Sequence, residues 1–229
     1  MLILGFAKTT LLDYPEHVAA TIFTGGCNFR CPFCHNGQMV MNPSSMPRIA
    51  EEEVISHLIK RKNVLDGVCI TGGEPTLQAD LTDFIVRIKD MGYKVKLDTN
   101  GSHPELLREL IDKKFIDYVA MDIKNCRQKY AITAGCSDSL VSKVYESVDI
   151  LKEGKIDYEF RTTVVRELHS REDMICLAKE IAGASKYYIQ SYVDSDNVIE
   201  RKYTSYSKEE LTDIAKCISF VNPHLRGID

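Results

Sequence analysis

The chain has 229 residues, a formal net charge of −4 at pH 7, 44% hydrophobic residues and 27% charged residues. This composition is typical of a globular protein with one sizeable core. Its net charge is slightly negative, so the protein has no overall positive field that would attract nucleic acid. No apolar run approaches the ~20 residues of a membrane helix, and residues 1–4 lack the charged region and the apolar core of a signal peptide. We therefore expect a cytoplasmic protein with no nucleic-acid or membrane partner.

Strand and helix patterns alternate six times along the chain. The strand segments are short and apolar, as in buried parallel strands, and the helical segments carry apolar residues at helical spacing or begin with a capping signal. The predicted strands are residues 17–24, 67–71, 94–99, 118–122, 157–165 and 186–191. The predicted helices are residues 51–62, 81–91, 104–113, 140–153, a segment from 171 onward, and 207–221.

This alternation predicts an α/β fold with a mostly parallel sheet and right-handed crossovers. Nothing in the sequence divides residues 1–229, so we expect one domain: a short lead-in (1–16), six βα units (17–191), and a loop with a C-terminal helix (192–229). An open doubly wound sheet and a partial barrel both fit the pattern. In either architecture, ligands gather beyond the carboxyl ends of the strands.

Three cysteines lie within eight residues after the first predicted strand. Cys27, Cys31 and Cys34 are spaced C-x3-C-x2-C, Phe33 precedes the third cysteine, and His35 follows it. Iron–sulfur clusters are held by thiolates, and three protein ligands leave one iron of a [4Fe–4S] cluster open. The alternatives are a zinc site with His35 as fourth ligand, although no second C-x2-C unit is present, and a disulfide with a spare thiol.

Further polar motifs stand at the ends of the next three predicted strands. They are Gly-Gly-Glu-Pro at 72–75, Leu-Asp-Thr-Asn-Gly at 97–101 and Ala-Met-Asp-Ile-Lys at 120–124. Glycines let the backbone approach a ligand closely, with a tight strand-to-helix turn as the alternative. A carboxylate at a strand end, as in Asp98 and Asp122, faces a site rather than the core, with helix capping or a solvated charge as the alternative.

At the cysteine loop the chain resembles the radical S-adenosylmethionine (SAM) superfamily. Its signature, C-x3-C-x-aromatic-C, is matched by Cys27, Cys31, Phe33 and Cys34. The resemblance implies a partial (β/α)6 barrel and a [4Fe–4S] cluster on the three cysteines, with the open iron chelated by SAM. Residues 72–74 look like the family's Gly-Gly-Glu motif, which binds the amino group of SAM.

The motifs at 97–101 and 122–124 resemble those of glycyl-radical-enzyme activases, and residues 23–36 are similar to the activating proteins of anaerobic ribonucleoside-triphosphate reductase. In activases the two aspartates help to hold a monovalent cation beside SAM. The resemblance therefore implies a cation site at Asp98, Thr99 and Asp122. Arg161 either reaches the site or forms a buried salt bridge, and Gln190 stands where related activases place a histidine. The expected SAM contacts are Phe33, His35, Gly72, Gly73, Glu74, Asp98, Thr99, Asn100, Asp122, Ile123, Lys124, Arg161 and Gln190.

The implied reaction is reductive cleavage of SAM, with an electron donor such as flavodoxin or ferredoxin, to a 5′-deoxyadenosyl radical that takes a hydrogen atom from a glycine of a partner enzyme. The cofactors carry this chemistry, so no catalytic side chain is predicted. The implied partner is anaerobic ribonucleoside-triphosphate reductase. Pyruvate formate-lyase or another glycyl radical enzyme, a small-molecule enzyme of the deazaguanine synthase type, and a cluster-bearing protein without catalysis are the rivals. The paired motifs of Asp98 and Asp122 favour an activase.

Overall fold

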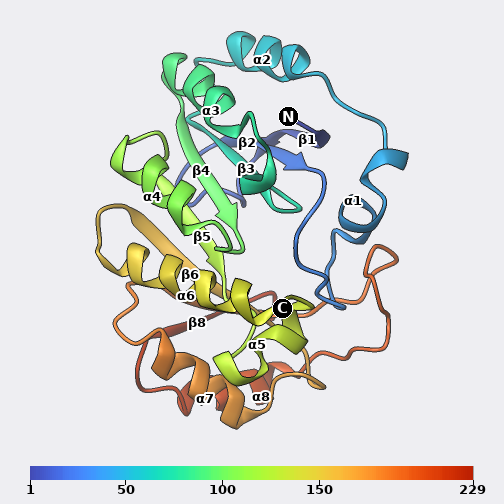
Figure 1. Ribbon diagram of the computed structural model, residues 1–229, viewed down its shortest axis with the longest axis vertical. Coiled ribbons are helices and arrows are strands. Elements are labelled where there is room, and N and C mark those ends of the chain that lie inside the picture. The colour runs from blue at the N-terminus through green and yellow to red at the C-terminus, as the bar shows by residue number, and fades with distance from the viewer. Residues whose placement is uncertain (229) are drawn as a thin grey trace.

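The computed structural model describes residues 1–228, so Asp229, the last residue of the predicted domain, lies outside the described residues. Its strands form one sheet in sequential order (Figure 1). β1 pairs antiparallel with β2, and each later strand pairs parallel with the one before it. The strands are β1 (Ile3–Thr10), β2 (Ala19–Thr24), β3 (Gly67–Gly72), β4 (Lys94–Thr99), β5 (Tyr118–Asp122), β6 (Asp157–Val164), β7 (Tyr187–Ser191) and β8 (Pro223–Arg226).

The helices connect the parallel strands and lie along the outside of the sheet (Figure 1). Right-handed crossovers between neighbouring strands in sequential order place all the helices on one face, so the sheet curves around its other face. This confirms the predicted partial barrel over the doubly wound alternative. The helices are α1 (Gly37–Met41), η1 (Pro43–Ser45), α2 (Glu51–Lys60), η2 (Pro75–Leu77), α3 (Leu81–Asp90), α4 (Pro104–Asp112), α5 (Arg127–Ala134), α6 (Asp138–Lys152), α7 (Arg171–Glu180) and α8 (Lys208–Lys216).

Both edges of the sheet correct the sequence analysis. The predicted lead-in contains β1, and the predicted C-terminal helix ends at Lys216, after which the chain adds β8 beside β7. Pro223 begins β8, as suits a residue without a backbone N–H at the start of an edge strand. No helix among residues 1–228 is long and apolar enough to cross a membrane.

The alternation of side chains along the strands makes the inside of the barrel polar. In β4, Val95 and Leu97 are fully buried with the main hydrophobic core, whereas Lys96 and Asp98 point to the other face. Asp122 on β5 is the register partner of Arg161 on β6. Because successive side chains of a strand point to opposite faces, these charged groups meet inside the barrel.

Candidate functional site

A cavity of about 500 Å³ lies at the carboxyl ends of the parallel strands. Its volume is within the range of small-molecule and cofactor sites. The three clustered cysteines line it, together with every expected SAM contact except Ile123. Asn36 also lines it and was not predicted, although its position two residues after Cys34 was a usable signal.

The cysteine loop is held from two sides by backbone hydrogen bonds. The Arg30 N–H donates to the carbonyl of Ala134, the last residue of α5, at 2.9 Å. On the other side, the Glu200 N–H donates to the Pro32 carbonyl at 2.8 Å and the Ile199 N–H to the Cys34 carbonyl at 3.3 Å. The segment after β7 therefore fixes the loop from behind and leaves its cysteines facing the cavity.

None of the three cysteines is in a disulfide; Cys31 is buried, and Cys27 and Cys34 are partly buried. Burial raises the pKa of Cys27 to about 11 and that of Cys31 to about 12, and it also raises the pKa of Cys34. The nearby Lys124 ammonium acts in the opposite direction on all three thiols. Thiolates at these positions therefore need compensation by positive charge, which iron would supply.

The arrangement fits a cluster better than a single metal ion. Among residues 1–228, no three His, Cys, Asp or Glu side chains are grouped as ligands of one ion. A [4Fe–4S] cluster binds each thiolate to a different iron, so its ligands line a cavity without meeting at a point. His35 is engaged elsewhere, because its Nε2 lies 2.6 Å from the Val193 carbonyl oxygen. The residues present fit a [4Fe–4S] cluster, and the zinc alternative has no support from their geometry.

The two glycines at the end of β3, Gly72 as its last residue and Gly73 directly after it, are required by the packing of the backbone. A Cβ atom on Gly73 would lie 1.9 Å from the Gly26 carbonyl oxygen, and one on Gly72, where φ is +110°, would lie 2.4 Å from the Thr24 nitrogen. The N–H groups of Gly73 and Glu74 donate to the carbonyls of Thr24 and Gly26, each at 2.8 Å. The motif therefore fastens the end of β3 to the segment that enters the cysteine loop.

Glu74 is fully buried, and its carboxylate accepts hydrogen bonds from within the chain. Oε1 accepts from the Thr76 N–H at 3.1 Å, the Thr76 hydroxyl at 2.5 Å and the Thr99 hydroxyl at 2.7 Å. Oε2 accepts from the Asn100 N–H at 2.7 Å. Burial raises the pKa of Glu74, whereas these donors lower it. The carboxylate thus joins the ends of β3 and β4.

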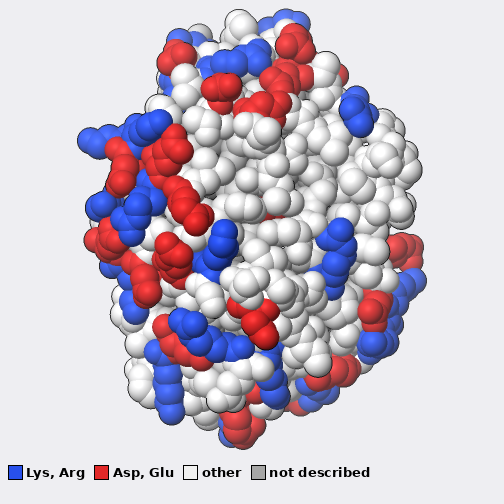
Figure 2. Space-filling view, in the orientation of Figure 1, with Lys and Arg blue, Asp and Glu red and all other residues white. Residues whose placement is uncertain are grey.

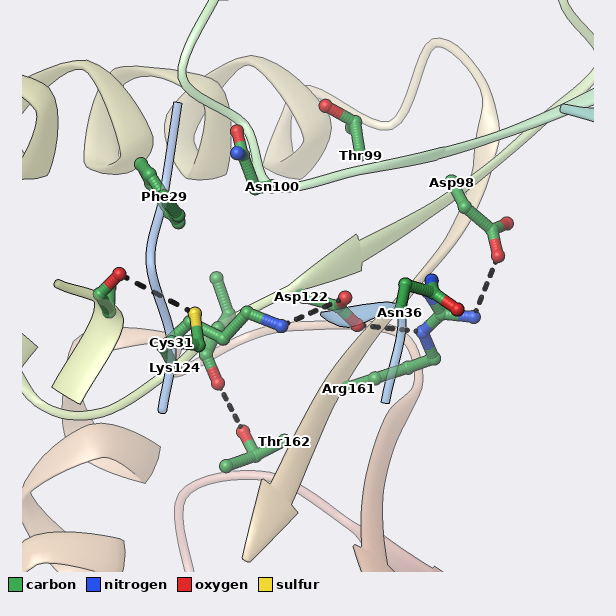
Figure 3. A network of polar contacts seen from close by, with 12 residues as sticks. Phe29, Cys31, Asn36, Asp98, Thr99, Asn100, Asp122, Lys124, Arg161 and Thr162 are labelled. Atoms are coloured by element: carbon green, nitrogen blue, oxygen red, sulfur yellow. Dashed lines mark hydrogen bonds and ion pairs between the residues drawn. The ribbon is translucent and has the colours of Figure 1, made fainter. Parts of the chain in front are cut away.

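A chain of alternating charges crosses the floor of the cavity (Figure 3). The Arg161 guanidinium lies between two carboxylates, 3.1 Å from Asp98 and 3.0 Å from Asp122. Lys96 pairs with the other oxygen of Asp98, and Lys124 lies 3.1 Å from Asp122. Burial raises the pKa of Asp122, but Arg161 and Lys124 lower it more, to about 2. Both alternatives for Arg161 therefore hold, since it lines the cavity and forms a buried salt bridge.

One expectation for this region needs correction. Ile123 does not line the cavity: its side chain is fully buried in the hydrophobic core, and its N–H donates to the Arg161 carbonyl at 2.8 Å. For the expected cation site, the structure shows that Thr99 donates to Glu74 and that Arg161 lies between the carboxylates of Asp98 and Asp122, and a cation at these residues stays a prediction. Figure 3 shows the Thr99 hydroxyl directed away from both aspartates.

Comparison with known proteins identifies the family. Residues 21–175 match the sequence profile of the radical SAM superfamily, and the chain belongs to that family. It is a radical SAM enzyme, and the family implies a [4Fe–4S] cluster and SAM as cofactors.

Within the family, a protein of Methanocaldococcus jannaschii that is provisionally assigned as a glycyl-radical enzyme activating enzyme is 34% identical over 221 residues, which cover 94% of this chain and 90% of that protein. The pyruvate formate-lyase-activating enzyme of Clostridium pasteurianum is 32% identical over 120 residues, half of this chain and 49% of that enzyme. Among solved structures, Streptococcus suis SuiB bound to precursor peptide SuiA superposes with a TM-score of 0.65 at 18% identity, over 90% of this chain and 48% of that one. At that identity the likeness concerns the fold.

Proposed function

We propose that this protein is the activating enzyme of a glycyl radical enzyme, and that its partner is an anaerobic ribonucleoside-triphosphate reductase. The observation that carries the proposal is the convergence of the cysteine loop and the strand-end motifs around Asp98 and Asp122 on one cavity. The near full-length match to the M. jannaschii protein supports the same class.

Cys27, Cys31 and Cys34 would hold the cluster, and SAM would lie in the adjacent part of the cavity. The charged chain below contains three cations (Lys96, Arg161 and Lys124) and two carboxylates, so it has one positive charge in excess, +3 − 2 = +1. The ammonium of Lys124 at one end of this chain suits an anionic group such as the carboxylate of SAM. Lys124, which lines the cavity beside the cysteines, is the side chain best placed to accept it.

When bound and reduced by a donor such as flavodoxin or ferredoxin, these cofactors supply a 5′-deoxyadenosyl radical, which takes a hydrogen atom from the target glycine. The residues of the chain position the cofactors and shield them. The backbone bonds between residues 72–74 and residues 24–26 fix the cluster loop, and buried ion pairs fix the floor. No side chain of the cavity is assigned a proton transfer.

The surface around the carboxyl ends of the parallel strands suits a polypeptide substrate. Exposed apolar side chains follow four different parallel strands: Met41 after β2, Leu77 after β3, Ile132 after β5 and Val193 after β7. In Figure 2, charged side chains crowd over the helices at the margins, whereas the middle of the face carries few charged side chains. An apolar surface with few charges is suited to contact with another protein.

The test is electron paramagnetic resonance of this protein mixed with SAM, a reductant and the anaerobic reductase, with pyruvate formate-lyase in a parallel sample. We expect a carbon-centred doublet with the reductase that changes when the glycine of the reductase is deuterated. A doublet only with pyruvate formate-lyase would reassign the partner. No doublet with either enzyme, together with SAM consumption driven by a small metabolite, would refute the activase proposal.

A further inference from the structure

We infer that Asn100 is a positioning residue for the cluster: its side-chain amide donates a hydrogen bond to the Cys27 sulfur and thereby raises the cluster's reduction potential. The inference rests on the proposed function, because it takes Cys27 to be a cluster ligand. The Asn100 Nδ2 lies 3.8 Å from the Cys27 Sγ, and Asn100 is only 6% exposed. Figure 3 shows Asn100 beside the loop segment that carries Phe29.

The orientation of this amide is determined by its neighbours. The Asn100 Oδ1 accepts from the Ser102 N–H at 2.9 Å, so the opposite side of the amide must carry the NH₂ group. That group donates to the Asn28 Oδ1 at 2.9 Å, and the Asn28 amide in turn donates to the Ser102 hydroxyl at 2.8 Å. The Asn100 backbone is anchored separately by its bond to Glu74 at 2.7 Å. The amide therefore presents an N–H to the sulfur with little freedom to rotate away.

The three cysteine sulfurs differ in their hydrogen-bond donors. Cys27 accepts from a backbone N–H, that of Phe29 at 3.3 Å, and from the side chain of Asn100. The Asn36 backbone lowers the pKa of Cys34. The Cys31 sulfur faces the Ala134 carbonyl oxygen at 3.5 Å, which is itself an acceptor. Asn100 is therefore the side chain through which a substitution can remove a donor from a cluster ligand while leaving the backbone unchanged.

The expected direction follows from electrostatics. Reduction adds negative charge to the cluster and its sulfur ligands, and an N–H dipole directed at a sulfur stabilises that charge. Hydrogen bonds to the ligands of a metal centre are a known way to adjust its properties. Loss of the Asn100 donor should therefore make the cluster harder to reduce.

The experiment is a redox titration, followed by electron paramagnetic resonance, of the reconstituted full-length protein without SAM. Asn100→Leu removes the amide, and Asn100→Asp keeps the acceptor for the Ser102 N–H but removes the donor. Both variants should bind the wild-type amount of iron and show a more negative reduction potential. The matched control is Ser102→Ala, which breaks the bond to Asn28 in the same network and leaves the donor to Cys27 in place, so its potential should equal that of the wild type.

Three outcomes would overturn the inference. The first is an iron-loaded Asn100 variant with the wild-type potential, and the second is a Ser102→Ala shift as large as that of Asn100→Leu. The third outcome applies if the Asn100 variants do not load iron. Pulsed electron paramagnetic resonance is then recorded on the reduced wild-type protein, labelled with ¹⁵N in its asparagine side chains. Absence of a ¹⁵N coupling to the reduced cluster would overturn the inference. Failure of the wild-type protein itself to bind iron would instead refute the cluster proposal, and this inference with it.

Discussion

Replacement of Glu74 by alanine tests whether this residue holds the fold of the site or contacts SAM. The carboxylate accepts from two buried backbone N–H groups, those of Thr76 and Asn100, and from the hydroxyls of Thr76 and Thr99. The hydroxyls can rotate to other acceptors, but the two N–H groups are fixed by the backbone. Glu74→Ala therefore leaves two buried donors without a partner.

The cost can be worked out from those two groups. A buried donor without a partner costs about 1–3 kcal/mol, so two cost about 4 kcal/mol in the middle of that range. For a domain of this size, each kcal/mol lowers Tm by roughly 2–4 °C, so Tm should fall by roughly 8–16 °C. This loss should appear in the protein without SAM or cluster, because every partner belongs to the chain.

The assay is urea and thermal unfolding of the cluster-free protein, followed by circular dichroism. Glu146→Ala is the matched control, since Glu146 is an exposed glutamate within α6, and it should change the free energy of unfolding by no more than about 0.5 kcal/mol. If Glu74→Ala unfolds like the wild type but binds SAM weakly, the carboxylate serves the ligand and the structural reasoning is refuted.

Three further predictions concern the cluster, the charged floor and pH. Cys27→Ser should prevent the uptake of about four irons per chain after anaerobic reconstitution, measured by iron analysis; full loading would contradict the ligand assignment. Lys124→Met should weaken SAM binding roughly 10–150-fold by calorimetry, the equivalent of a charge-assisted hydrogen bond, with iron content retained; unchanged affinity would remove Lys124 from the site. Burial lowers the pKa of His169 from its ordinary 6.5, so below pH 6.5 the unfolded chain binds a proton that the folded chain excludes. The free energy of unfolding should therefore fall by up to ~1.4 kcal/mol per pH unit as the pH drops toward the pKa of His169 in the folded protein. The measurement is the urea midpoint at a series of pH values. If His169→Gln shows the same dependence on pH as the wild type, the prediction is contradicted.

The six parallel strands could be predicted because each is a short apolar run that ends at a turn or polar motif. For β4 and β5 the predicted bounds, 94–99 and 118–122, are those of the structure. The edge strands gave weaker signals. The pairing of β1 shifts register between Ile3 and Gly5 and again between Ala7 and Thr10, which disturbs the alternation that marks a strand. β8 has four residues and begins with proline, so its pattern is too short to stand out.

The site could be located from the sequence because parallel strands end at one edge of a sheet, so motifs at strand ends must meet there. Individual roles could not be assigned in the same way. Ile123 follows β5 directly, but its N–H pairs with β6 and its side chain turns to the core. Thr99 lines the cavity while its hydroxyl is bound to Glu74. A sequence pattern gives the position of a residue along the chain but does not show which neighbouring group forms hydrogen bonds with its polar atoms.

The hydrogen bonds of Glu74 and Asn100 make one unit of three motifs that are separate in the sequence. Glu74 fixes the Asn100 backbone, the Asn100 side chain contacts Cys27, and Gly73 packs against Gly26 at the entrance to the cysteine loop. A substitution at any of these positions therefore moves or frees groups on the other motifs as well. Loss of SAM binding in a variant is therefore not enough to show that the replaced residue contacts SAM. The stability of the cluster-free protein and the potential of the cluster must be measured beside it, because loss of a residue whose only role is to contact SAM would leave both unchanged.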